Sequence, residues 1–246
     1  MNKIAVVTGG AGGIGRAIAE RFAKDKQTVV LLDMNEGAGT EVIAAFRKRG
    51  IEQSFLRADL TRETEVLASF DKIKANHGRI DALVNVAGGS VHRHLLQEFP
   101  LAHWQAVIDA NLTSTFLCCR AVIGMMKNQK SGAIINISSD IAFSGDAGRS
   151  AYAAAKAGIL GLTRSLALEL AADGVRVNAV APGRIATPRV RASYSDAEWD
   201  AAAKRIPLGH AGDPEDVAEA VAYLASDGAK HLTGQTIHVN GGRIMT

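Results

Sequence analysis

The chain has 246 residues, of which 47% are hydrophobic and 22% are charged, and its formal net charge is +3. This length suits one large α/β domain over residues 1–246, whose core needs neither disulfides nor metal, and it is short for two domains. The mild charge, with no lysine-rich run and no basic helix with interleaved aromatic residues, argues against nucleic acid as a partner.

The start of the chain and its cysteines indicate a soluble cytoplasmic protein. The first expected strand begins within a few residues of Met1, which leaves no room for a signal peptide. No apolar run reaches the roughly 18 residues of a membrane span, so we expect no membrane partner. The two cysteines, Cys118 and Cys119, are neighbours in an apolar helical stretch, which is typical of packed thiols in a reducing compartment.

The first element, at residues 4–8, is an apolar run typical of a buried strand. A glycine cluster at 9–15, followed by apolar residues at helical spacing, predicts a tight turn and a helix. A diphosphate reaches backbone N–H groups only where no Cβ intervenes, so such a turn is suited to holding an anion. Glycine-rich turns also occur for packing reasons alone.

A second buried strand, at residues 28–33, ends in the carboxylate of Asp33, eighteen positions after Gly15. An acid in this place accepts both hydroxyls of an adenosine ribose. Neither Gly12 nor Met34 supplies a positive charge to compensate Asp33 beside a 2′-phosphate. The strand end therefore predicts NAD rather than NADP as the cofactor.

The next elements continue the alternation of strand and helix. The sequence predicts a helix over 36–49, a third strand over 54–59 and a helix over about 62–76. A fourth strand, at 80–85, runs into small residues at 86–89. Small residues at the carboxyl end of a central strand are expected where a ligand crosses the sheet edge and the strand order reverses.

Residues 90–100 are polar and irregular, and they hold His92, Arg93 and His94 close together. A His-x-His pair suggests a metal ion. Neither a carboxylate nor a third ligand lies at usable spacing in the sequence, so we expect no metal here.

Helical patterning covers residues 101–126 and includes Asn111, although a polar residue within a helix is more often at the surface than catalytic. The fifth strand, at 133–139, ends in the hydroxyls of Ser138 and Ser139. Both are candidates for a site at the sheet edge.

Tyr152 and Lys156 lie four residues apart at the start of an alanine-rich helix, so their side chains emerge on the same face. A phenol has a pKa of about 10, and a neighbouring ammonium stabilises the phenolate and lowers that pKa. The tyrosine then becomes usable as an acid or base near neutral pH. Taken alone, the pair also fits an exposed aromatic residue beside a snorkelling lysine.

The last third of the chain predicts a sixth strand at 175–180 and a seventh at 234–239. Between them lie a polar segment at 188–206 and a helix with proline in its first turn, ending near residue 225. Irregular segments of that length are commonly functional.

Several of these motifs resemble those of the classical short-chain dehydrogenases/reductases. Residues 8–15 are similar to the family's T-G-x-x-x-G-x-G turn, and residues 182–187 to its P-G-x-I-x-T segment. Residues 85–88 are similar to its N-N-A-G element, with Val86 in place of the second Asn. The resemblance covers essentially the whole chain.

The family's serine-to-tyrosine spacing is thirteen, which matches Ser139 and Tyr152 and favours Ser139 over Ser138. The resemblance implies a single doubly wound α/β domain of the Rossmann type. Its seven-stranded parallel sheet would have the order 3-2-1-4-5-6-7, with a substrate lid at about 188–206.

The resemblance also implies the catalytic roles. Tyr152 would be the general acid/base on the substrate oxygen, and Ser139 would hydrogen-bond to that oxygen. Lys156 would lower the pKa of Tyr152 and hold the nicotinamide ribose. Asn111 would anchor a water molecule that links Lys156 to solvent.

The same resemblance implies the residues that hold the dinucleotide. Asp59 would bond the adenine amino group, a role compatible with capping the helix that opens near Thr61. The expected cofactor residues are Gly9, Gly13, Ile14, Gly15, Asp33, Met34, Asp59, Leu60, Asn85, Ala87, Gly88, Tyr152, Lys156, Pro182, Gly183, Ile185 and Thr187.

The expected activity is reversible NAD-dependent hydride transfer between a secondary alcohol and its ketone. One alternative is a 3-oxoacyl thioester reductase of fatty-acid synthesis, against which Asp33 speaks because those enzymes usually take the phosphorylated cofactor. Another is a nucleotide-sensing binding protein without catalysis, which the presence of all four catalytic positions disfavours. A homotetramer is expected by analogy with the family.

Arginines border the expected pocket, and their planar forks suit a carboxylate, sulfonate or phosphate on a substrate. Arg149 lies on the catalytic loop, and Arg191 lies on the lid with Arg189. We expect Arg149 and Arg191 to hold an anionic substrate if one is used. The alternative is that these arginines are solvated or make subunit contacts.

Overall fold

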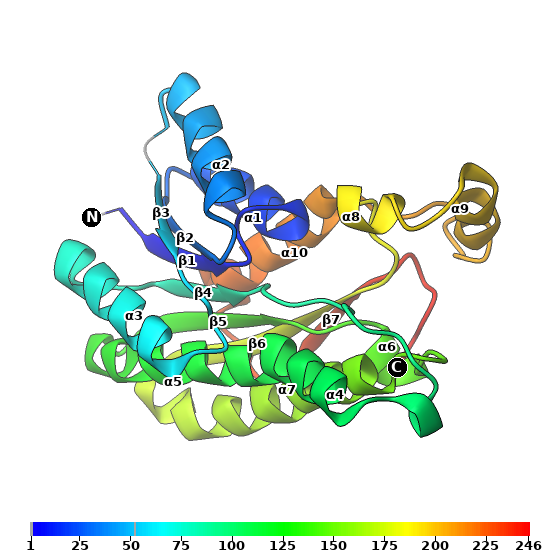
Figure 1. The fold of residues 1–246 in the computed structure, drawn as a ribbon. Helices are drawn as coiled ribbons and strands as arrows, with labels where there is room; N and C mark the ends of the chain where they lie inside the picture. The colour runs from blue at the N-terminus through cyan, green and yellow to red at the C-terminus, as the bar shows by residue number, and fades with distance from the viewer. Residues whose placement is uncertain (1, 52) are drawn as a thin grey trace.

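The computed structural model describes residues 2–51 and 53–246 and is organised around a seven-stranded sheet (Figure 1). All neighbouring strands are parallel, in the order β3-β2-β1-β4-β5-β6-β7, which confirms the predicted doubly wound sheet. The strands are β1 Ile4–Thr8, β2 Thr28–Asp33, β3 Ser54–Arg57, β4 Ala82–Asn85, β5 Gly132–Ile137, β6 Val175–Pro182 and β7 Thr236–Val239.

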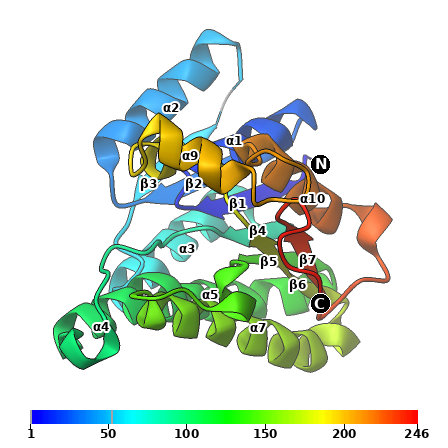
Figure 2. The same ribbon diagram turned by 90° about the vertical axis from the view of Figure 1, so that its right-hand side faces the viewer.

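Helices cover both faces of this sheet (Figures 1 and 2). One face carries α1, α2 and α10, and the other carries α3, α5 and α7. The helices are α1 Gly13–Lys24, α2 Glu36–Lys48, α3 Glu63–His77, α4 Leu101–Ile108, α5 Ser114–Gln129, α6 Ile141–Ser144, α7 Ser150–Leu170, α8 Pro188–Arg191, α9 Asp196–Ala203 and α10 Pro214–Ala225.

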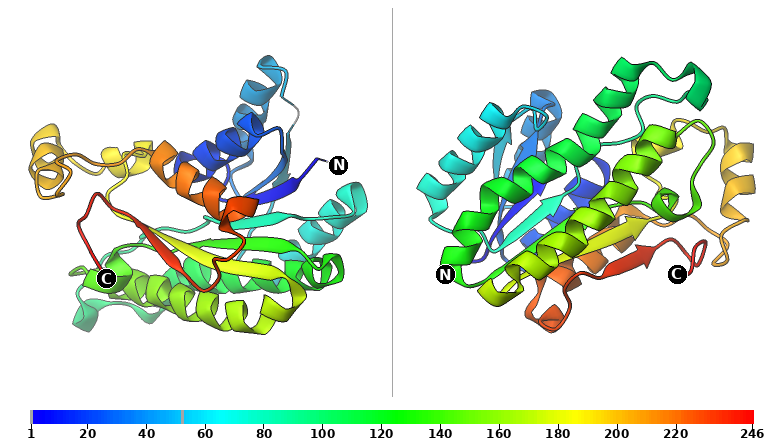
Figure 3. Two further views of the ribbon diagram at one scale, coloured as in Figure 1. Left: turned by 180° about the vertical axis from the view of Figure 1, so that it is seen from behind. Right: turned by 90° about the horizontal axis from the view of Figure 1, so that it is seen from below.

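The central strands are apolar on both sides because helices bury both of their faces. Every residue of β1 and β5 is buried, and the side chains alternate between the two hydrophobic layers. This explains why these strands read as continuous apolar runs rather than as alternating patterns. Figure 3 shows α3, α5 and α7 side by side beneath the sheet, and α1 beside α10 on the far face.

The strand order reverses at β1, which lies between β2 and β4. In open parallel sheets a crevice forms at such a point beyond the carboxyl ends of the strands. The glycine turn after β1, the small residues after β4 and the serines after β5 all lie at that edge, because parallel strands end on the same side.

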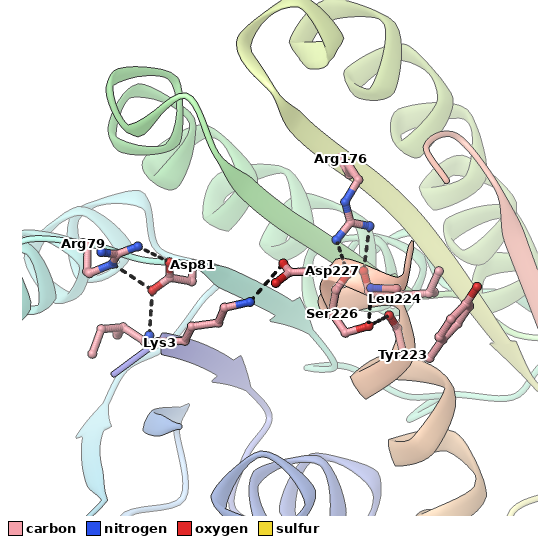
Figure 4. Close-up of polar contacts among 10 residues, drawn as sticks. Lys3, Arg79, Asp81, Arg176, Tyr223, Leu224, Ser226 and Asp227 are labelled. Atoms are coloured by element: carbon pink, nitrogen blue, oxygen red, sulfur yellow. Dashed lines mark hydrogen bonds and ion pairs between the residues drawn. The ribbon is translucent and has the colours of Figure 1, made fainter. Parts of the chain in front are cut away.

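The opposite, amino-terminal edge of the sheet is held by polar contacts (Figure 4). Asp81 accepts a hydrogen bond from the backbone N–H of Ile4 at 2.8 Å and pairs with Arg79. Lys3 pairs with Asp227, and Arg176 donates to the backbone oxygens of Leu224 and Ser226. These contacts join the first strand to the end of α10, far from the crevice.

The helix predicted over 101–126 is interrupted in the structure. α4 ends at Ile108, a π-helical turn spans Asp109–Thr113, and α5 follows. A π-turn inserts an extra residue into the helical repeat and is frequent at functional sites. It places Asn111 on the inner side of the helix, with no exposed surface, so Asn111 is not the surface residue that helical patterning alone suggests.

The helical run Leu101–Gln129 is long and apolar enough to cross a membrane by length and composition, with a mean hydropathy of 1.4. It contains scattered polar residues, so it is not an uninterrupted apolar run, and the expectation that the protein has no membrane partner stays a prediction. Of the most apolar 18-residue stretch in this run, 44% is buried in the structure, and α5 packs on the sheet and against α3. A core helix passes the same test of composition.

Residues 188–206, the predicted lid, contain α8 and α9, and α9 projects away from the sheet (Figure 1). Ser195 begins α9 with a capping box, in which its hydroxyl accepts from the N–H of Glu198 and the Glu198 carboxylate accepts from the N–H of Ser195. Tyr194 and Trp199 pack edge to face with ring centroids 5.9 Å apart. Local contacts of this kind give the segment its own structure although it packs little against the sheet.

Candidate active site

The glycine turn after β1 packs tightly on the end of β4. Gly9 has a φ of +63°, and a Cβ there would lie 2.9 Å from the Cα of Ala87. A Cβ on Gly15 would lie 2.1 Å from the Gly9 carbonyl oxygen. Thr8 accepts hydrogen bonds from the N–H groups of Val86 and Ala87. The turn therefore requires glycine both for its backbone conformation and for its close approach to the neighbouring strand.

The amino end of α1 is free to receive an anion. Gly12 is its N-cap without a side-chain cap, and the first turn carries no acidic residue. A Cβ on Gly12 would meet nothing within 4 Å, whereas one on Gly13 would lie 3.1 Å from the Thr187 methyl group. A helix N-terminus favours negative charge, and Thr187 reaches it from the end of β6. Ile14 is half-buried and packs on the core below.

Asp33 is fixed at the end of β2. Its Oδ2 accepts a hydrogen bond from the N–H of Ala11 at 3.1 Å, and its Oδ1 accepts from the N–H of Asn35 at 3.0 Å. Asp33 makes no ion pair with any residue that the structure describes. The carboxylate therefore faces the crevice with its charge uncompensated, beside Met34, which is 65% exposed.

Asp59 lies in the turn after β3 rather than at a helix cap. Its Oδ1 accepts from the N–H and the hydroxyl of Thr61, and the hydroxyl bond is the chief cause that lowers the Asp59 pKa. α3 begins later than the sequence predicts, at Glu63, with Arg62 as its N-cap. Next to Asp59, Leu60 is buried in the core.

Asn111 clamps the glycine segment that follows β4. Its Oδ1 accepts from the N–H of Gly89 at 2.9 Å, and its Nδ2 donates to the carbonyl oxygens of Gly89 and Val107. A Cβ on Gly88 would lie 2.4 Å from the Asn111 Oδ1. The side chain is therefore committed to backbone groups, and its role toward a bound water stays a prediction.

The side chain of Asn85 lies below the crevice rather than in it. Its Nδ2 donates to the Oδ1 of Asn136 at 2.8 Å and contacts the Cys119 sulfur, and Asn136 in turn donates to Thr163. This buried network joins β4 and β5 to α5 and α7. The pleat of β4 turns the Asn85 side chain toward the helices, and the expectation that Asn85 helps to bind the cofactor stays a prediction.

Ser139 and Tyr152 come together as the spacing predicts. Ser139 is buried and Tyr152 is half-buried, and a hydrogen bond from Ser139 lowers the pKa of the Tyr152 phenol. The hydroxyl of Ser138 is engaged elsewhere, since it donates to the carbonyl oxygen of Lys156 at 2.8 Å. The structure thus agrees with the choice of Ser139.

Lys156 is 3% exposed, and its Nζ lies 5.7 Å from the centroid of the Tyr152 ring and donates to the Ile137 carbonyl oxygen at 2.8 Å. Burial, with a smaller effect of the Arg189 charge, lowers the pKa of Lys156 to about 7. The ammonium is therefore only partly populated at neutral pH.

Burial raises the pKa of Tyr152, and the Ser139 hydrogen bond and the Arg189 charge oppose that rise. The expectation that Lys156 lowers the Tyr152 pKa stays a prediction.

The segment after β6 reaches the crevice beside the catalytic loop. Pro182 ends β6, and a Cβ on Gly183 would lie 2.8 Å from the Cβ of Asn240 and 3.3 Å from the Oδ2 of Asp140. Ile185 is buried against the core. These residues therefore shape the floor of the crevice, next to the turn that contains Ser139.

Sequence reasoning missed two residues that hold the catalytic loop. Asp140 is 2% exposed, accepts from the Ser139 hydroxyl and pairs with Arg243 at 2.6 Å. Arg243 lies three residues before the last residue, Thr246, so no local pattern connects it with Ser139. The only sequence signal for this contact is that an acid, Asp140, directly follows Ser139.

The arginines expected to bind an anion are already paired. Arg149 forms an ion pair with Asp146 at 3.2 Å. Arg191 pairs with Asp196 and stacks on Trp199. Arg189 instead reaches the crevice, where both terminal nitrogens of its guanidinium lie 3.4 Å from the Gly88 carbonyl oxygen.

Arg189 also bears on the catalytic groups, since its charge lowers the pKa of both Tyr152 and Lys156. The anion-binding prediction therefore moves from Arg149 and Arg191 to Arg189.

The described residues fit a dinucleotide. The uncapped start of α1 with Thr187 suits a diphosphate, and Asp33 suits a ribose diol. Lys156 lies deep in the same crevice, where the catalytic pair is found. Along the edge of the sheet Asp33 comes first, then the start of α1, and then Lys156. A dinucleotide would span them in this order, with the adenosine ribose at Asp33 and the diphosphate at α1.

Known proteins resemble this chain along nearly its whole length. A family model described as enoyl-(acyl carrier protein) reductase matches residues 9–243. The chain is 41% identical over 246 residues to 3-oxoacyl-[acyl-carrier-protein] reductase of Staphylococcus epidermidis, covering 100% of both chains. It is 43% identical over 240 residues to cis-4-hydroxycyclohexanecarboxylate dehydrogenase of Sinomonas cyclohexanicum, covering 98% of this chain and 96% of that protein.

Solved structures also resemble this fold closely. The crystal structure of gox2181 has a TM-score of 0.95 at 34% identity and covers 98% of this chain and 95% of its own. The crystal structure of levodione reductase has a TM-score of 0.93 at 32% identity, and the match covers 98% of this chain and 97% of that one. The likeness therefore extends to sequence as well as fold.

Proposed function

Because the chain belongs to the short-chain dehydrogenase/reductase family, we propose that it transfers a hydride reversibly between NAD(H) and a carbonyl/secondary alcohol pair. The observation that carries this proposal is the convergence of Ser139, Tyr152 and Lys156 beside a cradle for a dinucleotide. The nicotinamide ring supplies or accepts the hydride when bound.

The chain's own residues handle the proton and the substrate oxygen. In the direction of reduction, Tyr152 donates its phenolic proton to the oxygen, and Ser139 holds that oxygen by a hydrogen bond. Lys156 lies beside the phenol, with its Nζ 5.7 Å from the centroid of the Tyr152 ring, and its pKa of about 7 suits it to give or to take a proton in either direction. Lys156 would also hold the nicotinamide ribose. Asn111 keeps the Gly88–Gly89 segment in place beside them.

Asp33 supports NAD as the preferred cofactor. Its carboxylate would face a 2′-phosphate at close range, and juxtaposed like charges cost several kcal/mol. We expect the wild-type kcat/KM with NAD to exceed that with NADP by roughly 100-fold. Asp33→Asn keeps the shape and removes the charge, so it should shrink that ratio by at least about tenfold.

Steady-state kinetics with both cofactors measures the ratio. Asp59→Asn is the matched control, because Asp59 lies on the next strand end and its removal should affect both cofactors alike. Equal use of the two cofactors by the wild type, or a ratio unchanged in Asp33→Asn, would count against NAD specificity.

Two substrate classes have support, and the relatives support a 3-oxoacyl thioester better than a free secondary alcohol. Several relatives similar over the whole chain are named 3-oxoacyl-[acyl-carrier-protein] reductase. The Sinomonas relative is named for an alicyclic alcohol that bears a carboxylate. Arg189 favours an anionic substrate of this second class, because its guanidinium lies free of any carboxylate among the described residues.

A panel of substrates separates these classes. It contains a short 3-oxoacyl thioester, a hydroxycyclohexanecarboxylate and a neutral cyclohexanol of similar size. If a carboxylate binds Arg189, Arg189→Met should raise KM for the acidic alcohol by at least about tenfold and leave KM for the neutral one nearly unchanged. Arg191→Met is the control, since Arg191 is paired with Asp196. Equal effects on acidic and neutral alcohols would rule out a salt bridge to the substrate.

We propose a homotetramer and a cytoplasmic location from the family resemblance. The mass in solution by light scattering checks the assembly, and a monomer at micromolar concentration would refute it.

A further inference from the structure

Three histidines come together at the edge of the substrate side of the crevice. His92 and His94 lie in the loop after β4, and His103 lies in the first turn of α4. One ring nitrogen from each residue lies within 4.8 Å of the other two. The expectation that His92 and His94 lack a third ligand is therefore corrected. His103 follows His94 by nine residues, and the fold places its ring beside theirs.

The three rings pack closely on one another. The Nε2 of His94 lies 3.0 Å from the Nδ1 of His103, and the rings of His92 and His103 stack at 3.9 Å with an angle of 4° between their planes. None of the three makes an ion pair with a carboxylate among the described residues. Imidazole nitrogens are common ligands of transition-metal ions, and three of them lie together here.

The surroundings keep the cluster ordered and partly dry. All three histidines are half-buried. The ring of Phe99 meets that of His94 edge to face at 5.1 Å, and Trp104 packs on Phe99.

We propose that His92, His94 and His103 form a binding site for one divalent transition-metal ion of the zinc class. Two nitrogens bound tetrahedrally at about 2.0–2.1 Å from one zinc ion lie about 3.3 Å apart, so the His94–His103 pair needs to open by only a few tenths of an ångström. Imidazole suits zinc, cobalt, nickel and copper, whereas magnesium and calcium prefer oxygen. Three protein ligands leave a fourth position for water.

The place of the site suggests what the ion would do. The backbone N–H of His94 donates to the carbonyl oxygen of Gly148 at 3.0 Å, and Gly148 lies four residues before Tyr152. A metal ion would therefore tie the loop at 90–100 to α4 next to the segment that leads into the catalytic helix. The hydride transfer proposed above does not depend on this ion.

The test uses the full-length chain without an affinity tag, after treatment with a chelator. Co²⁺ is titrated while visible absorption is recorded, because its bands report the number and type of ligands, and Zn²⁺ is titrated by calorimetry. We expect one equivalent to bind, with four-coordinate Co²⁺ bands. His92→Ala, His94→Ala and His103→Ala should each weaken binding by at least about tenfold. Mg²⁺ should not compete.

His210→Ala and His231→Ala are the matched controls, because both residues are exposed and lie outside the cluster. Thermal unfolding without metal checks that each variant is folded, and His103→Gln replaces His103→Ala if the latter is not. The proposal is overturned if no saturable binding occurs, if the triple alanine variant binds as the wild type does, or if the control variants lose affinity equally.

Discussion

Tyr152→Phe should lower kcat by at least about 10² to 10⁴ while leaving the affinity for the dinucleotide nearly unchanged. The substitution removes one oxygen and the transferable proton but keeps the ring, which packs beside Lys156. Ser139 remains to orient the substrate oxygen, but no other group in the described site is placed to donate a proton to it. Steady-state kinetics gives kcat, and NADH fluorescence gives the dissociation constant.

Tyr223→Phe is the control for this experiment, because Tyr223 is 49% exposed on α10 and its hydroxyl is far from the crevice. That variant should retain wild-type kcat. If Tyr152→Phe turned over substrate at nearly the normal rate, another residue would be the acid and the assignment would fail.

Lys156→Met should abolish most activity and at the same time stabilise the fold at neutral pH. Lys156 is 3% exposed, and burial lowers its pKa from the usual 10.5 to about 7. Between these two values the unfolded chain binds a proton that the folded chain does not. Wild-type stability should therefore rise with pH through this window on account of Lys156.

The Lys156→Met variant has no ammonium at this position, so its folding does not require the loss of a proton from a buried lysine. At pH 7 its free energy of unfolding should exceed that of the wild type, by an amount on the order of a few kcal/mol. The difference should shrink as pH rises toward 10. Urea unfolding at several pH values measures it. Cys118 and Cys119 also titrate on unfolding, but they do so in both proteins and cancel in the comparison.

The kinetic part of this prediction separates two roles of Lys156. Loss of the ribose contact should raise the dissociation constant for NADH, whereas loss of the proton path should lower kcat. Lys24→Met is a control on the exposed end of α1 and should change neither quantity. A variant that kept wild-type kcat, or whose stability followed pH as the wild type does, would contradict the assigned position of Lys156.

Much of the fold could be predicted because its signals are local. The apolar runs of β1, β2 and β5 fill single strands, and the glycines at 9–15 directly follow the first of them. The i,i+4 pair of Tyr152 and Lys156 needs only one helix to bring its members to one face. Ends of elements were less well predicted, as with β3, which stops two residues before Asp59.

The sequence by itself determined the order of strands and helices along the chain, the glycine turn, the acid at the end of β2 and the pairing of Ser139 with Tyr152. Each of these depends on residues close in the chain or on a spacing that one element fixes. Only the tertiary structure showed that Arg189, and not Arg149 or Arg191, reaches the crevice.

Tertiary structure alone also placed His103 beside His94. It also directed the Asn85 side chain into the interface between the sheet and α5. It likewise buried Lys156, which lowers the pKa of that lysine to about 7. Pairing, desolvation and the direction of a side chain depend on which distant segments pack around a residue, and a linear pattern carries no record of those neighbours.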